Sequence, residues 1–273
     1  MYLLLTTSYK CYMPGDLETN AVMTVYEKWA LIMSAIAILI PIIQWAWKKW
    51  IVRPRLNHYH TGNIYLFINQ SGSYMRVDSV YEAINKPISI KNISANVERL
   101  HDHSKRDYVW SSFLSPTNLR FIGNNAFSNE IAHPFRIDSD NICCAFTEFA
   151  DKDNSAYRSF SRLNEKLLEE VKRISITQTS YEDALTAYTK TSAYEEAKRE
   201  LENELYWRIG TYSLSIIAEY EKKKKCFQFQ FEVTQEQYQQ LQINIDETVV
   251  APLKQMFGVR LNMQMVQTKL NSK

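Results

Sequence analysis

The sequence predicts an α+β protein: a single N-terminal transmembrane helix, then a cytosolic antiparallel β-sandwich of the immunoglobulin-like (Ig-like) kind, with an inserted helical pair and a C-terminal helix. Three observations predict this class. A long uncharged apolar run lies near the N-terminus, strand-like alternation appears in two blocks further on, and helical spacing lies between these blocks. Alternation indicates strands because successive side chains point to opposite faces, whereas a helix repeats about every 3.6 residues.

The apolar run extends from Trp29 to Trp47 and contains no charged residue. At a rise of about 1.5 Å per residue it is about 28 Å long, enough to cross the hydrocarbon of a bilayer. Tryptophan and basic side chains are typical of the headgroup level, so they indicate where the span meets water. The residues expected at the membrane interface are Trp29, Trp45, Trp47, Lys48, Lys49, Trp50, Arg53 and Arg55. We therefore expect an anchor with its flanks over residues 24–53.

The flanks of the anchor predict its orientation. Four basic residues follow it within eight positions, whereas the preceding flank mixes basic and acidic residues. By the positive-inside rule, the N-terminus faces outward and the C-terminal domain faces the cytoplasm, as in a single-pass signal anchor of the inner (plasma) membrane. Residues 1–23 lack the charged start and the cleavage site of a signal peptide, and we expect this segment to be mobile.

Three residues within the span could serve more than anchoring. Ser34 and Gln44 are polar, and Pro41 removes a backbone donor in the middle of the helix. Polar groups in a span are costly unless they face a partner or water. These residues are therefore candidates for a helix–helix contact or for the lining of a pore.

The cytosolic domain is expected over residues 54–257 and begins with a β block. Alternate residues of three predicted strands are apolar and would form one buried face. They are Ile64, Leu66 and Ile68, then Met75 and Val77, then Ile93, Ala95 and Val97. Turn signals at residues 71–73 and 85–87 separate these strands. Several short strands with turns between them are typical of an antiparallel sandwich.

Helical spacing takes over at about residues 155–209, which we interpret as a helical pair inserted into the sandwich. An apolar stripe at steps of three and four begins at Tyr157 and predicts the first helix. Thr179 or Ser180 would cap the second helix, because each side chain can accept a hydrogen bond from a free amide of the first turn. The sequence therefore predicts two helices between two β blocks.

A hairpin is predicted over residues 211–232, where two alternating strands flank a run of lysines. Thr234 and Gln237 then form a capping box, which predicts a helix that continues, with a break, to Phe257. A lone hairpin is marginally stable in water, so we expect it to complete the sheet that begins before the helices. Residues 258–273 are expected to form a tail.

Catalytic motifs are missing from the sequence. It contains no GxSxG, P-loop, GxGxxG or HExxH pattern. Only six glycines occur, so loops that cradle phosphates are poorly supplied. We therefore expect that the protein is not an enzyme and needs no cofactor.

Two HxH pairs, His58 with His60 and His101 with His103, could each place two imidazoles on one face of a strand. His101 and His103 are the weak metal candidates, but the number and spacing of ligands fall short of a recognised site, and no metal is expected. The four cysteines show no CxxC spacing, which indicates that Cys143, Cys144 and Cys226 are reduced thiols in a cytosolic domain, while Cys11 is expected on the other side of the membrane.

The four lysines at the predicted hairpin tip are a candidate contact for an anion or another ligand. They are Lys222, Lys223, Lys224 and Lys225. A nucleotide would suit such a tip, although no other sequence feature supports one. A formal net charge of +2 gives no general electrostatic reason to bind nucleic acid.

These observations favour a membrane-anchored cytosolic module that docks a protein partner or senses a ligand, from a bacterial or phage-related source. The alternative is a membrane effector whose ligand-driven self-association forms a pore. In layout alone, the chain resembles small effectors of bacterial antiphage defence, which join a short membrane part to a cytosolic β domain. That resemblance implies the alternative function, and an enzyme is the least favoured class.

Overall fold

The computed structural model describes residues 24–116, 127–153 and 155–272. The chain divides into two compact units, Met1–Val52 and Arg53–Lys273. The first contains the apolar helix, and the second contains every strand and the remaining helices of the described residues. The N-terminal segment that the sequence predicts to be mobile lies outside the described residues.

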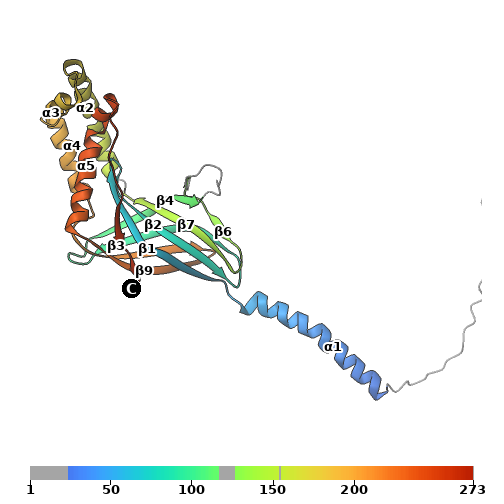
Figure 1. The fold of residues 1–273 in the computed structure, drawn as a ribbon. Coiled ribbons are helices and arrows are strands. Elements are labelled where there is room, and N and C mark those ends of the chain that lie inside the picture. Colours follow the sequence, from blue (N-terminus) through green and yellow to red (C-terminus); the bar gives the residue numbers. More distant parts are fainter. Residues whose placement is uncertain (1–23, 117–126, 154, 273) are drawn as a thin grey trace, which may run out of the picture. The chain divides into compact units, whose positions relative to one another are not determined.

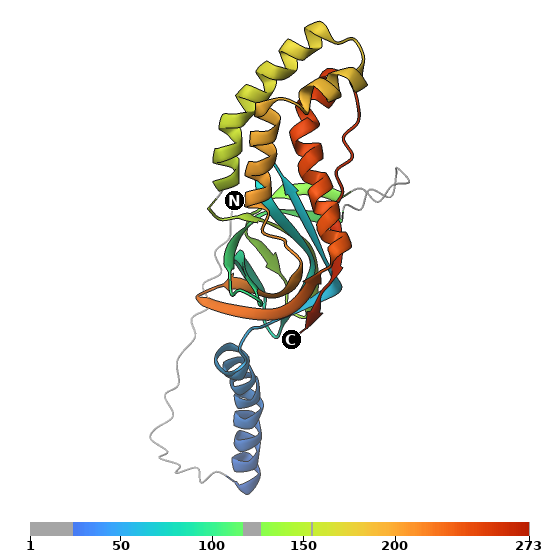
Figure 2. The ribbon, with the colours of Figure 1, turned by 90° about the vertical axis from the view of Figure 1, so that its left-hand side faces the viewer.

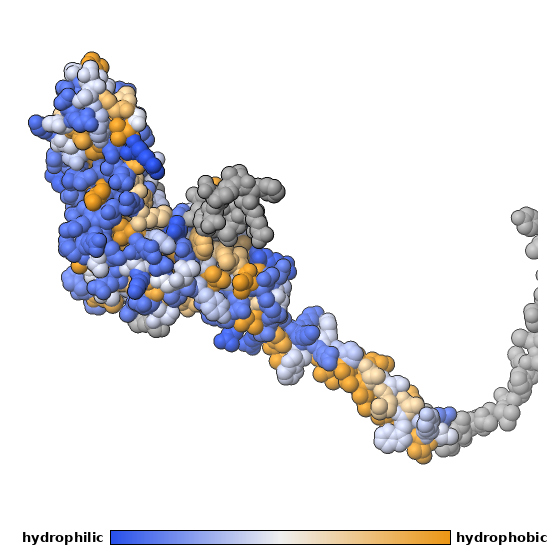
Figure 3. Space-filling model, viewed as in Figure 1, coloured by the Kyte–Doolittle hydropathy of each residue, from blue (hydrophilic) through white to orange (hydrophobic). Residues whose placement is uncertain are grey.

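One long helix forms the described part of the first unit. Helix α1 (Val25–Ala46) continues into a π-helical turn, η1 (Trp47–Ile51). The Thr24 hydroxyl accepts a hydrogen bond from the Glu27 amide at 3.3 Å, and the Glu27 carboxylate accepts one from the Thr24 amide at 2.8 Å. Pro41 lies inside α1 without ending it. No residue of α1 is buried, its surface is apolar along most of its length (Figure 3), and it is long and apolar enough to cross a membrane.

The described part of the second unit contains one antiparallel sheet, where the sequence predicts the two sheets of an Ig-like sandwich (Figure 1). Its strands are β1 (Arg55–Asn69), β2 (Gly72–Ile84), β3 (Ile88–Arg99), β4 (Lys105–Pro116), β5 (Phe127–Ile131), β6 (Phe135–Ile137), β7 (Asn141–Asp151), β8 (Gly210–Tyr220), β9 (Lys223–Val233), β10 (Val266–Lys269) and β11 (Asn271–Ser272). The order is β10-β1-β2-β7-β4-β3-β8-β9-β11, while β5 pairs with β4 and β6 pairs with β3. The sheet curves around its interior and is nearly barrel-shaped (Figure 2).

The predicted inward faces of the strands are confirmed, even though the architecture differs from a sandwich. The alternate apolar residues of β1, β2 and β3 are at most 1% exposed; these are Ile64, Leu66, Ile68, Met75, Val77, Ile93, Ala95 and Val97. The predicted hairpin is formed by β8 and β9, which pair along their whole length. Alternation identifies each strand, but it does not reveal whether the strands form two packed sheets or one sheet that curls back on itself.

The C-terminal segment joins the two edges of the sheet. Strand β10 pairs with β1, and β11 pairs with β9. Between them Leu270 is 2% exposed, and its amide donates to the Gly62 carbonyl at 2.8 Å. The Thr268 hydroxyl donates to the Glu232 carbonyl at 2.6 Å. What the sequence predicts to be a tail therefore closes the barrel.

Among the described residues, four helices form a bundle at one end of the barrel (Figures 1 and 2). They are α2 (Ser155–Thr177), α3 (Tyr181–Tyr188), α4 (Ser192–Glu204) and α5 (Gln235–Met256). The described chain between β7 and β8 forms three helices where the sequence predicts a pair, because Thr191 caps a new helix by accepting from the Tyr194 amide at 3.2 Å. The predicted Ser180 cap and the Thr234–Gln237 capping box are both present. Helix α5 runs unbroken to Met256 with Pro252 inside it, so the predicted break is absent.

The chain after α4 fills the end of the barrel nearest the bundle. Trp207 is fully buried, its indole donates to the Tyr74 carbonyl at 3.2 Å, and its ring stacks on Tyr108 with 5.5 Å between ring centres. The Tyr206 amide donates to the Ser73 hydroxyl at 3.2 Å. These contacts connect the bundle to the barrel. They also hold in place strands that carry the surface sites described in the next subsection.

Candidate functional site

Of the predicted interface residues in the first unit, Trp29 lies near the start of α1, and the others lie at the end of α1 and on η1. The Trp45 and Trp50 rings have centres 6.3 Å apart, and the Lys49 ammonium lies 4.6 Å from the centre of the Trp45 ring. The side chains of Trp47 and Lys48 are also exposed. Aromatic rings and cations on one helix end are typical of the headgroup level.

A hollow on the outer face of the barrel, which we call the outer pocket, has a volume of about 240 Å³. Its lining residues come from β1, β2, β7 and the chain just before β10: Tyr65, Phe67, Asn69, Tyr74, Met75, Arg76, Glu148 and Met265. Strand register explains this grouping, because Tyr65 lies opposite Arg76, Phe67 lies opposite Tyr74, and Arg76 lies opposite Glu148. The pocket therefore combines three aromatic side chains with charged groups, a composition that is typical of ligand sites.

The charges at the outer pocket are held in fixed positions. The Arg76 guanidinium carbon lies 4.2 Å from the centre of the Tyr65 ring, and its Nε lies 3.2 Å from the Asp78 Oδ1. Burial raises the pKa of the Asp78 carboxyl, and the positive charge of Arg76 opposes that shift. The Glu148 carboxylate accepts a hydrogen bond from the Ser112 hydroxyl at 2.6 Å. An aromatic wall, the Arg76 cation and the Glu148 carboxylate can orient one ring or one polar group.

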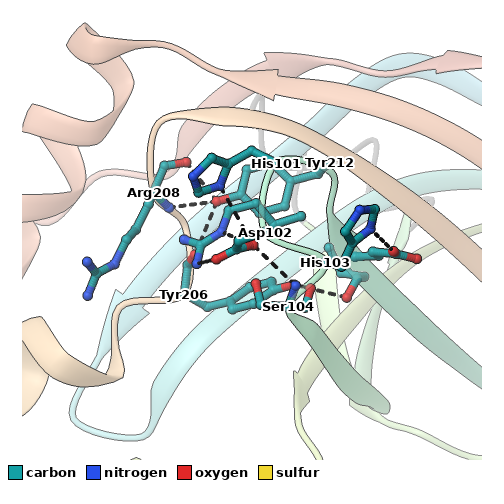
Figure 4. A network of polar contacts seen from close by, with 10 residues as sticks. His101, Asp102, His103, Ser104, Tyr206, Arg208 and Tyr212 are labelled. Atoms are coloured by element: carbon teal, nitrogen blue, oxygen red, sulfur yellow. Dashed lines mark hydrogen bonds and ion pairs between the residues drawn. The ribbon is translucent and has the colours of Figure 1, made fainter.

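The predicted metal candidates lie apart on the turn between β3 and β4 (Figure 4). The His103 Nδ1 is 3.0 Å from the Glu98 carboxylate, whereas the His101 Nδ1 is 3.8 Å from Asp102 on the other side of the turn. Among the described residues, no group of three or more histidine, cysteine, aspartate or glutamate side chains could hold a metal ion. The cysteines within the described ranges, Cys143, Cys144 and Cys226, carry free thiols.

The polar side chains around the turn between β3 and β4 form hydrogen bonds within the turn and with the chain that follows α4 (Figure 4). Asp102 accepts hydrogen bonds from the Arg99 guanidinium at 2.9 Å and from the Ser104 amide at 3.1 Å, and the bond from Arg99 holds the pKa of Asp102 well below its usual range. The Tyr206 hydroxyl lies 2.9 Å from the Ser104 carbonyl, and the Tyr212 hydroxyl accepts from the Arg208 amide at 2.7 Å. These bonds hold the turn against the segment that fills the barrel.

His58, in the other HxH pair, is partly buried and packs among aromatic rings. Its Nε2 lies 2.9 Å from the Ser79 hydroxyl, and its ring packs against Tyr81 and Phe227 with 4.9 and 4.8 Å between ring centres. Burial lowers the pKa of His58 to about 3, and the charge of His60 adds to that shift. His58 is therefore a neutral core histidine at neutral pH, near the end of the barrel where β1 begins.

The predicted lysine tip lies beside the first residues of β1. The Lys225 ammonium donates a hydrogen bond to the Leu56 carbonyl, although these residues are 169 positions apart in the sequence. The hairpin tip and the start of β1 therefore form one cationic surface, which we call the basic rim. It comprises Arg53, Arg55, Lys222, Lys223, Lys224 and Lys225. The sequence predicts both groups of cations, those after the span and those at the hairpin tip, but it does not predict the outer pocket.

Comparisons with known proteins leave the family open. No family model matches the chain, and no curated protein matches it. The chain is similar to a solved structure described as a family 123 glycoside hydrolase from Clostridium perfringens, with 10% sequence identity and a TM-score of 0.30. The match covers 66% of this chain and 27% of that one, so the chain spans less than a third of the protein that it matches. A similarity of this size does not identify a function.

Proposed function

We propose that the protein is a binding module rather than an enzyme: a barrel tethered to the inner membrane by α1, with the barrel in the cytoplasm. Its ligand is a small molecule or a side chain of a docked protein partner, held in the outer pocket. The observation that supports this proposal is that three aromatic side chains, Tyr65, Phe67 and Tyr74, line the pocket together with Arg76. The Arg76 guanidinium is in turn held by its ion pair with Asp78. Apolar walls with a few fixed polar groups are the usual chemistry of a recognition site.

The size of the outer pocket limits what it can hold. Its volume of about 240 Å³ lies below the range of about 300–1,000 Å³ that is usual for drug-sized ligands. A single ring or one protein side chain fits this volume better than a dinucleotide. A planar group would pack against Tyr74 or Phe67, and a polar substituent would face the charges of Arg76 and Glu148.

Native mass spectrometry of the full-length protein, purified in nanodiscs from the cells that express it, tests this proposal. Tyr74→Ala and Arg76→Met remove one wall and the cation of the outer pocket, while Tyr157→Ala removes an exposed tyrosine from α2 as a matched control. We expect the wild type and the control to retain a bound molecule or partner. Both pocket variants should lose it by at least about tenfold, which corresponds to a contact of about 1.4 kcal/mol. Equal retention by all four proteins would contradict the proposal.

An effector that oligomerises into a pore is the second candidate, and Gln44 favours it. The Ser34 hydroxyl donates to the Ala30 carbonyl at 2.9 Å, so its hydrogen-bonding capacity is met within the helix. In the described chain, the Gln44 side-chain amide makes no hydrogen bond, and an unpaired amide in lipid favours contact with a second helix. Gln44→Leu should therefore lower the oligomer size of the solubilised protein, while Ser34→Ala should leave it unchanged. An unchanged oligomer in Gln44→Leu would remove this support.

A further inference from the structure

The basic rim carries positive charge that the described residues only partly neutralise. Lys224 pairs with Glu219 at 2.5 Å. Arg55, Lys222 and Lys223 are exposed and form no ion pair within the part of the chain that the structure describes. Glu221 lies in the same hairpin turn and is exposed as well. The rim therefore presents a net positive surface to solvent.

The cations of the rim also repel one another. Lys225 is held against the first residues of β1 by its bond to Leu56. Burial lowers the pKa of Lys225, and the nearby charge of Arg55 lowers it further. Like charges that the fold brings together are stabilised when an anion binds between them. The surface is therefore suited to an anionic partner.

We propose that the basic rim binds the phosphate groups of anionic phospholipids in the bilayer that holds the anchor. Arginine binds phosphate through its planar fork of donors, and lysine binds it as a point charge. Clusters of basic residues beside a span are typical of attraction to anionic lipid surfaces. The rim adds to such a cluster by bringing the β8–β9 hairpin to the start of β1.

The length of the connecting chain favours lipid over a free anion. Leu56 follows Ile51, the last residue of η1, by five residues. Five residues span at most about 18 Å when fully extended. The basic rim is therefore tethered close to the end of the anchor, where the local concentration of headgroups exceeds that of any dissolved phosphate. This inference does not depend on the outer pocket.

Hydrogen exchange of the full-length protein in nanodiscs tests the inference. The discs contain phosphatidylcholine alone or phosphatidylcholine with about one third phosphatidylglycerol, an anionic lipid. We expect exchange of the hairpin amides at residues 221–226 to slow at least about threefold in the anionic discs, and the effect to disappear at high salt because exposed charges are then screened. The far end of the bundle, residues 172–180, serves as an internal reference and should not change.

A double variant, Lys222→Gln with Lys223→Gln, should abolish the lipid-dependent slowing. Lys172→Gln with Lys190→Gln removes the same charge from exposed positions on the bundle and should retain the slowing. Exchange in the barrel core reports whether each variant still folds. Equal exchange in neutral and anionic discs, or equal slowing in the rim variant, would overturn the inference. Slowing by added inorganic pyrophosphate in neutral discs, without any effect of anionic lipid, would also overturn it and would assign the rim to a soluble phosphate.

Discussion

The Arg76 guanidinium lies over the ring of Tyr65, its partner across the β1–β2 pair, with its central carbon 4.2 Å from the ring centre. The same guanidinium reaches Asp78 at 3.2 Å. Because Arg76 contacts a ring and a carboxylate at once, displacing it breaks both interactions. This arrangement fixes one wall of the outer pocket, which would lower the entropic cost of binding the ligand proposed above.

The Tyr65–Arg76 contact should be measurable in the folded protein itself. A double-mutant cycle with Tyr65→Leu and Arg76→Met isolates the pair from the loss that Asp78 suffers when its partner is removed. A half-buried cation–π contact predicts a coupling of about 0.5–1 kcal/mol in the free energy of unfolding by urea. A coupling near zero would show that the guanidinium does not rest on the ring.

We expect Trp207 to contribute more to the free energy of unfolding than any other single residue where the barrel meets the bundle. Its ring stacks on Tyr108 and lies edge-on to Tyr212, and its indole donates to the Tyr74 carbonyl. Trp207→Ala should therefore lower the free energy of unfolding by about 3–5 kcal/mol. Tyr157→Ala, which truncates an exposed ring, should cost less than about 1 kcal/mol in the same urea titration. A similar cost for both variants would contradict the buried position of Trp207.

The buried imidazole of His58 predicts acid sensitivity. Its pKa is about 3 in the folded protein, while in the unfolded chain it returns to about 6.5. The unfolded state therefore binds the proton first as the pH falls. Stability should be complete above about pH 6.5 and should decrease towards pH 3, by at most about 1.4 kcal/mol per pH unit. Burial lowers the pKa of the partly exposed His60 as well, which acts in the same direction.

Replacing His58 by phenylalanine separates its share of this acid sensitivity from that of other groups. The substituted ring can still pack against Tyr81 and Phe227, although the Ser79 hydroxyl loses its bond to the imidazole at every pH. Urea unfolding at about pH 7 and about pH 5 should show a smaller loss of stability on acidification in His58→Phe than in the wild type. An equal loss of stability on acidification in both proteins would mean that the pKa of His58 is the same in the folded and unfolded states.

Local patterns predicted the strands and helix caps because those features depend on neighbouring residues. The alternation of Ile64, Leu66 and Ile68 identified an inward face, and Thr234 with Gln237 identified the start of α5. The break after α3 was missed because Thr191 lies within a stretch that also fits one continuous helix. A side chain that can cap a helix is also tolerated inside one, so the sequence alone did not decide between them.

The outer pocket could not be predicted because strand register brings its residues together. Tyr65 and Phe67 occupy outward positions of β1, where aromatic side chains are a signal of a covered or functional face. Nothing local, however, indicates that Arg76 lies beside Glu148, which belongs to another strand later in the chain. The same holds for the basic rim. The sequence shows the cations around the start of β1 and those of the β8–β9 hairpin, but only the fold brings the two groups together.

The closure of the barrel by the C-terminal segment gives the last prediction. Strand β10 has four residues, too few for alternation to stand out, yet Leu270 beyond it is almost completely buried. Leu270→Ala should lower the free energy of unfolding by about 2–4 kcal/mol, because it leaves a cavity where the two edges of the sheet meet. Lys269→Ala changes the exposed neighbour and should cost less than about 0.5 kcal/mol. If hydrogen exchange in Leu270→Ala also rises at the β1–β10 and β9–β11 pairs, the segment acts as a clasp; an effect no larger than that of Lys269→Ala would show that the barrel is stable without it.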